Sequence, residues 1–110
     1  MSNEISKELL SEVLETKAFD IEISNSTVVC LIGNGSEYRI NINELAHKCK
    51  EWAASKGYYI YSGVSFDNSG HSYITLSTSI SKRLITFSED TEPESIFKAC
   101  QWVMEKQWEP

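Results

Sequence analysis

The sequence predicts an α+β fold in which a mainly antiparallel sheet of five to six strands has three helices packed on it. Three segments repeat apolar residues with the helical period, and six short segments alternate or run apolar as strands do. Short turns join the strands within each block of three, which favours antiparallel neighbours. Whether all six strands belong to one sheet stays open at this level. No linker divides the 110 residues, so a single domain (1–110) is expected.

The first two helices are predicted at residues 3–18 and 43–56. The first places apolar side chains on one half of its wheel and glutamates on the other, a pattern typical of a solvated outer face. Asn41 or Asn43 caps the second helix, and Gly57 ends it where a left-handed conformation is favoured. The apolar stripe of this helix consists of Leu45, Ala46, Cys49, Trp52 and Ala53.

The last helix is predicted at residues 91–108, with Thr91 and Glu94 forming a capping box at its start. Its apolar stripe gathers Ile96, Phe97, Cys100, Val103, Met104 and Trp108. Trp102 points away from this stripe, among charged side chains. Three interpretations of Trp102 are open: a second element covers the helix there, a partner binds it, or the side chain is simply exposed.

The six strands are predicted at residues 20–24, 27–32, 37–42, 58–66, 72–80 and 84–88. The segment at 27–32, TVVCLI, is apolar throughout, as expected of a strand covered on both faces. Alternation in the fourth strand places Ile60, Val64 and Phe66 on one face, together with Tyr58. The glycines at 33–35 lie between two strands, so they are interpreted as a hairpin turn rather than a phosphate-binding loop.

Composition narrows the classes of function. The net charge is −6, which argues against non-specific binding to nucleic acid or to an anionic membrane, although residues 38–88 carry six Lys/Arg against three Asp/Glu. The start of the chain lacks a basic segment followed by an apolar block, and no run is long enough to span a bilayer, so a cytoplasmic protein is expected.

The residues that usually carry chemistry are few. Three cysteines without CxxC spacing argue against a disulfide framework or a structural zinc site. Cys49 and Cys100 lie at the centres of apolar stripes, so both are interpreted as core thiols. His47 and His71 are interpreted as surface histidines. We therefore predict no catalytic residue, no cofactor and no metal site.

One face of the second strand block is a candidate binding surface. Alternation places several tyrosines and hydroxyl side chains on the face away from the core: Tyr59, Tyr61, Ser65, Tyr73, Thr75, Ser77 and Ser79. Aromatic side chains on an open sheet can stack bases, and they also simply suit a half-exposed pleat. The candidate partner-binding residues are Trp102, Tyr59, Tyr61 and Tyr73.

At ELAHKCKEWAASKGY (44–58) and DTEPESIFKACQWVMEKQ (90–107), with ISKELLSEVL near its start, the chain resembles small uncharacterised proteins encoded in phage and prophage regions. The resemblance implies an accessory protein that acts by binding, and it brings no assigned activity. We expect a non-enzymatic protein that binds a protein partner or itself, with nucleic acid and membrane not expected as partners. The alternative is a weak binder of single-stranded nucleic acid that uses the tyrosines.

Overall fold

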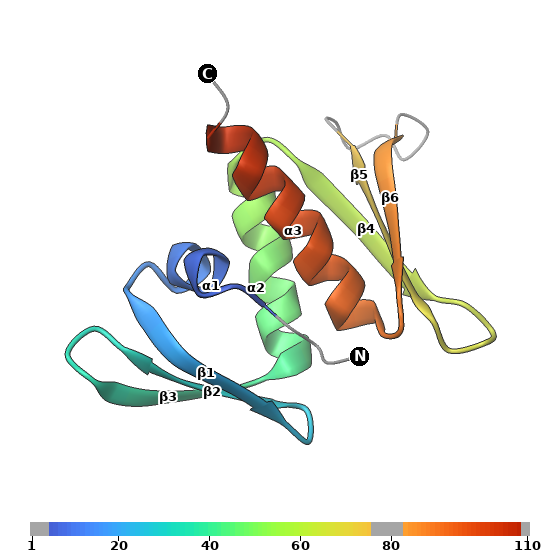
Figure 1. Ribbon diagram of the computed structural model, residues 1–110. Coiled ribbons are helices and arrows are strands. Elements are labelled where there is room, and N and C mark those ends of the chain that lie inside the picture. Colours follow the sequence, from blue (N-terminus) through green and yellow to red (C-terminus); the bar gives the residue numbers. More distant parts are fainter. Residues whose placement is uncertain (1–4, 76–82, 109–110) are drawn as a thin grey trace.

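Three helices and six strands form the part of the chain that the computed structural model describes, residues 5–75 and 83–108 (Figure 1). In chain order they are α1 (Lys7–Leu14), β1 (Ala18–Ser24), β2 (Thr27–Ile32), β3 (Ser36–Asn41), α2 (Ile42–Ser55), β4 (Tyr59–Val64), β5 (Gly70–Thr75), β6 (Arg83–Glu89) and α3 (Glu92–Trp108). The expected strand residues 76–80, which include Ser77 and Ser79, lie outside the described residues, and so does the side chain of Trp108.

The strands form two antiparallel sheets of three, in the orders β1-β2-β3 and β4-β5-β6. The predicted α+β class and the antiparallel pairing are thereby confirmed. The question that the sequence leaves open is also answered, because the strands are divided between two sheets rather than joined in one of five or six. Each block pairs through local hairpins, and α2 carries the chain from the first sheet to the second (Figure 1).

The helices lie between the two sheets (Figure 1). Helix α3 packs along β4, β5 and β6, α2 lies against α3 and β4, and α1 packs on β1. Buried side chains from the helices and from both sheets form one cluster, in which the largest fully buried residues include Leu9, Leu10, Leu45, Ile74, Phe97 and Met104. Among the described residues, no helical stretch combines the length and the apolar character that a bilayer crossing requires.

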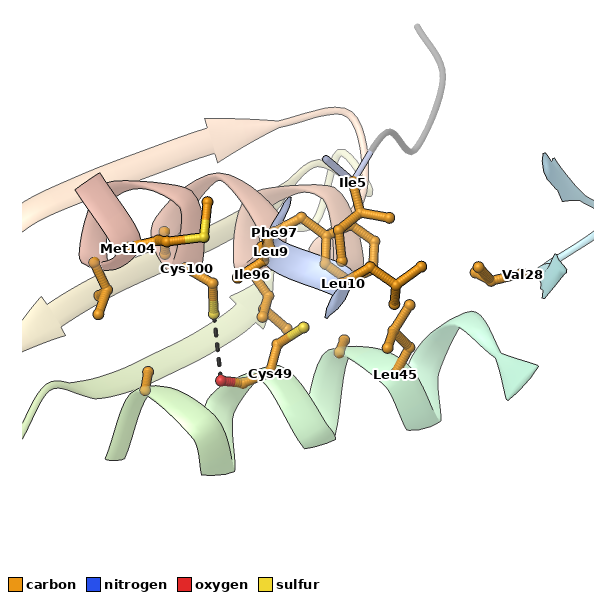
Figure 2. Close-up of a cluster of buried hydrophobic side chains, with 14 of the residues drawn as sticks. Ile5, Leu9, Leu10, Val28, Leu45, Cys49, Ile96, Phe97, Cys100 and Met104 are labelled. Atoms are coloured by element: carbon orange, nitrogen blue, oxygen red, sulfur yellow. Dashed lines mark hydrogen bonds between the residues drawn. The ribbon is translucent and has the colours of Figure 1, made fainter. Parts of the chain in front are cut away.

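Two cysteines lie where α2 meets α3 (Figure 2). Cys49 and Cys100 are fully buried, and the thiol of Cys100 donates to the carbonyl oxygen of Cys49 at 3.4 Å. Burial raises the pKa of the Cys100 thiol well above its ordinary value, which keeps it protonated. The prediction that both are core thiols is confirmed, and Cys30 is also buried and free.

The helix ends follow their capping signals. The side chain of Asn41 accepts a hydrogen bond from the N–H of Asn43 at 2.8 Å, so the cap of α2 is the first of the two predicted asparagines. Gly57 has a φ of 91°, as predicted for the residue that ends this helix. At the start of α3 the N–H of Glu94 donates to Thr91 Oγ1 at 3.3 Å, which forms the backbone half of the predicted capping box.

Helix α1 is shorter than the predicted 3–18. Ser6 caps it by accepting a hydrogen bond from the N–H of Leu9 at 3.1 Å, and Glu15 ends it with a left-handed φ of 58°. Ala18 already belongs to β1. The prediction was wrong at its C-terminal end because a left-handed glutamate carries no residue-type signal of the kind that glycine gives.

The prediction that residues 27–32 are covered on both faces is wrong. Val28 and Cys30 are buried toward the helices, whereas Val29 and Leu31 stay partly exposed on the opposite face. The helices all lie on the inner side of this sheet, so in the described part of the chain no helix packs on its outer face (Figure 1).

The end of β4 also differs from the prediction. Val64 and Phe66 share a strand face with Ile60 in the alternation pattern, yet Val64 is 58% exposed and Phe66 is 103% exposed. Helix α3 begins opposite Gly70, the residue that pairs with Val64, so the sheet extends past the layer that covers it. Alternation predicts the side of a strand to which a residue points, but not where the covering layer stops.

The start of α3 is fixed closely to β5. A Cβ built on Gly70 would collide with the backbone of residues 91–92. Next to it, the hydroxyl groups of Ser72 and Ser95 share a buried hydrogen bond of 2.7 Å. The absence of a side chain at Gly70 therefore allows the helix to approach the sheet.

Candidate functional site

The outer face of the second sheet carries three of the four predicted partner-binding residues. We call Tyr59, Tyr61 and Tyr73 the tyrosine face. Tyr61 pairs directly with Tyr73 across β4 and β5, and their rings stack with centroids 6.4 Å apart and planes at 29°. All three tyrosines are partly exposed, whereas Thr75, which pairs with Tyr59, is buried.

Helix α3 covers the opposite face of this sheet. The buried Ile60, Ser72 and Ile74 point toward the helix, and alternation sends the tyrosines the other way. Figure 1 shows no helix on the side of β4, β5 and β6 that faces away from α3. The tyrosine face is thus a half-exposed aromatic surface without a helix over it in the described structure.

The basic side chains of the middle segment that the structure describes do not gather on the tyrosine face. Arg39 lies in β3, while Lys48, Lys50 and Lys56 lie on α2 or at its end. Lys82 lies outside the described residues, as does the side chain of Arg83. No described side chain on the strand faces that carry the tyrosines is a lysine or an arginine.

His71 lies at the end of the same sheet face, at the centre of a hydroxyl cluster. Its Nε2 hydrogen-bonds with Ser65 Oγ and lies 3.3 Å from Ser69 Oγ, and its Nδ1 lies 2.9 Å from Ser88 Oγ. Ser69 Oγ in turn donates to Asp67 Oδ1 at 2.6 Å. The cluster ties the turn at residues 65–69 to β6. The sequence indicated Ser65 on this face but gave no sign of Ser88, whose position depends on the pairing of β5 with β6.

A serine beside a histidine suggests nucleophilic catalysis, so the geometry needs a test. In a catalytic triad a carboxylate on the far ring nitrogen orients the histidine and stabilises its charged form. Here the far nitrogen, Nδ1, meets the hydroxyl of Ser88. Among the described hydrogen bonds, no carboxylate reaches the His71 ring. The described contacts of His71 form a hydrogen-bond network that links the turn at residues 65–69 to β6.

Trp102, the fourth predicted residue, is partly buried and packs against the core cluster. The Tyr58 ring meets it edge-on, with centroids 5.8 Å apart and planes at 85°. The ammonium group of Lys106 lies 5.2 Å from the indole centroid. Of the three interpretations, coverage by a second element describes these contacts best, and Trp102 lies apart from the tyrosine face in sequence and in its contacts.

Glu94 is a buried carboxylate that the sequence gave no reason to single out beyond its capping role. It is 2% exposed, and its Oε1 has no hydrogen-bond partner among the described residues. Burial raises the pKa of this carboxyl above its ordinary value, and the nearby charges of Glu89 and Asp90 raise it further. The Glu94 carboxyl group therefore stays protonated to a higher pH than the carboxyl group of a solvent-exposed glutamate.

The remaining residues that could carry chemistry are His47 and possible metal ligands. His47 is exposed on α2, with its Nε2 3.7 Å from Glu51 Oε2 one helical turn away. Within the described residues, no group of three or more His, Cys, Asp or Glu side chains is arranged to hold a metal ion.

Comparison with protein-family models, with curated proteins and with solved structures finds no match for this chain. The resemblance to phage and prophage proteins therefore stays a prediction.

Proposed function

We propose that this chain is a non-enzymatic accessory protein that binds a protein partner through the tyrosine face. The observation that carries the proposal is the stacked pair of Tyr61 and Tyr73 on a sheet face that no described helix covers. Tyrosine is enriched in protein interfaces because its ring supplies apolar contact area while its hydroxyl group stays hydrogen-bonded. A pair already fixed across two strands loses little conformational entropy on binding.

Charge favours a protein partner over nucleic acid. Binding to a phosphate backbone depends on lysine and arginine side chains that release counterions. The described side chains of this face supply none, and the whole chain carries a net charge of −6. The expected phage or prophage origin leads to the same class of accessory binding protein.

The test compares two variants with the unchanged protein. Tyr61→Ala with Tyr73→Ala removes the stacked pair, and Phe19→Ala removes a partly exposed aromatic side chain from β1 in the first sheet. Each protein is immobilised and challenged with lysate from the native host. We expect the double tyrosine variant to lose proteins that the unchanged chain and Phe19→Ala both retain. Equal retention by all three would contradict the proposal.

Single-stranded nucleic acid remains the second candidate because stacked tyrosines on an open sheet can hold bases. At low salt a short oligonucleotide should then quench the protein's fluorescence, and the effect should weaken as salt rises. Tyr61→Ala should cost about 1–3 kcal/mol of binding free energy, the usual value for one stacked base. An absence of binding at high micromolar concentration would remove this candidate.

A further inference from the structure

A groove of about 490 Å³ lies between α1, β1 and α3. Its apolar lining comes from Ile5, Ile21, Ile23 and Phe97, and its polar lining from Ser6, Lys98 and Gln101. Ser6 Oγ donates to Gln101 Oε1 at 2.8 Å, so these two groups partner each other. Lys98 is exposed and supplies the positive charge among the described lining residues. The groove therefore suits an apolar group that has a negative charge beside it, and its volume falls in the range of roughly 300–1,000 Å³ that is usual for binding pockets.

The chain carries such a pair at the turn between β4 and β5. Phe66 is 103% exposed, more than any other large apolar side chain described, and the exposed Asp67 follows it. Ser65 N–H donates to the carbonyl oxygen of Ser69 at 2.9 Å, and Ser69 N–H donates to Asp67 Oδ1 at 3.0 Å. The turn thus presents the phenyl ring from a fixed backbone, which lowers the entropic cost of binding.

The turn also holds the carboxylate beside the ring in place. The hydroxyl group and the N–H of Ser69 both donate to the Asp67 carboxylate, and these hydrogen bonds lower the pKa of Asp67. A solvated aspartate is already charged at neutral pH, and the lowered pKa extends the charged range of Asp67 to more acidic pH.

We propose that Phe66 of one copy inserts into the groove of a second copy, with Asp67 placed toward Lys98. The apolar lining fits the ring, and the single ammonium group fits the carboxylate that follows it. The turn between β4 and β5 lies on one side of α3, whereas α1 and β1, which line the groove together with α3, lie on its other side (Figure 1), so the turn cannot reach the groove of its own molecule. The contact joins two different surfaces, which makes it a head-to-tail association. It uses no residue of the tyrosine face.

Sedimentation velocity from about 10 μM to about 1 mM covers the range expected of so small a contact. We expect the average mass of the unchanged chain to rise with concentration. Phe66→Ser and Lys98→Glu, both at exposed positions, should each weaken association about tenfold or more. Leu84→Ser removes another exposed apolar side chain, 47% exposed on β6, and should associate like the unchanged chain.

A mixture of the two variants isolates the contact itself. Phe66→Ser keeps an intact groove, and Lys98→Glu keeps an intact turn, so the mixture should form a one-to-one pair that neither variant forms alone. A mixture that stays monomeric overturns the proposal, as does an unchanged chain that stays monomeric up to about 1 mM. Equal loss of association in Leu84→Ser and Phe66→Ser overturns it as well. The Tyr61→Ala, Tyr73→Ala variant should associate normally, which separates this test from that of the tyrosine face.

Discussion

Replacing Gly70 by alanine should destabilise the protein by about 2–3 kcal/mol. The new Cβ would lie far inside the 3.4 Å at which ordinary contact begins, against the backbone of residues 91–92. A backbone cannot rotate out of the way as a side chain can, so the start of α3 has to move by about 1 Å. Forced overpacking of this kind costs about 1–3 kcal/mol.

The shift also disturbs the hydrogen bonds that hold α3 on the sheet. Ser72 and Ser95 share their buried bond at 2.7 Å, and Ser62 Oγ donates to Glu92 Oε2 at 2.6 Å. Weakening the buried bond adds about 1 kcal/mol. Alanine in place of glycine recovers about 0.4–1 kcal/mol by reducing the entropy of the unfolded chain. Together these contributions give a net loss of about 1–3.5 kcal/mol, and the severe overlap at Gly70 places the variant in the upper part of that range.

Urea unfolding of Gly70→Ala and Gly63→Ala provides the measurement and its matched control. Gly63 lies in the partner strand, and a Cβ there meets nothing within 4 Å. With a denaturant slope of about 1–3 kcal/mol/M, Gly70→Ala should lower the midpoint by about 0.7–3 M, while Gly63→Ala should leave it unchanged or raise it slightly. Midpoints of the two variants within about 0.3 M of each other would refute the close packing of α3 on β5.

Three further predictions concern buried groups. The thiols of Cys49 and Cys100 are fully buried, so a thiol reagent should label them slowly in the folded protein and fast in denaturant. Rapid labelling of the folded protein would contradict their burial. Burial raises the pKa of the Glu94 carboxyl above 4.5, so the folded state holds this proton more tightly than the unfolded chain does. The free energy of unfolding should therefore fall as pH rises from 4.5 through the raised pKa. Urea midpoints measured from about pH 4 to pH 7 should lose this slope in Glu94→Gln, and an unchanged slope would refute the assignment to Glu94. Trp102→Ala should lose about 2 kcal/mol in urea unfolding, less than the 3–5 kcal/mol of a fully buried tryptophan because the indole is only partly buried. A loss below about 0.5 kcal/mol would mean that its packing contributes nothing.

Local signals in the sequence located the helices and the middle strand well. The cap at Asn41 and the left-handed Gly57 fix both ends of α2 within a residue or two of the prediction. Residues 27–32 form β2 with the predicted bounds. These features depend on neighbours in the chain, and residue type reports them directly. The left-handed Glu15 is a local feature without such a signal, and there the prediction overran.

Features set by distant contacts were not predictable in the same way. Gly70 looks in the sequence like part of an ordinary turn, yet its hydrogen side chain is what allows α3 to approach β5. His71 looks like a lone surface residue until the pairing of β5 with β6 brings Ser88 to its ring. Trp102 was predicted to point away from the apolar stripe, yet it lies partly buried against the core cluster, and its neighbour Tyr58 comes from a different part of the chain.

The number of layers connects the wrong prediction for β2 with the candidate binding surfaces. The apolar run at residues 27–32 predicted a strand covered on both faces, and three helices could cover both faces of a single sheet. Two sheets have four faces, and the helices lie between the sheets, where they cover the two inner ones (Figure 1). The outer faces then carry the residues that alternate away from the helices. These are Val29 and Leu31 on the first sheet and the tyrosine face on the second. Alternation along a strand identifies those residues from the sequence. Their exposure, however, follows from the division into two sheets, which depends on long-range strand pairing. A binding role for the tyrosine face therefore depends more on this arrangement of layers than on the tyrosines themselves.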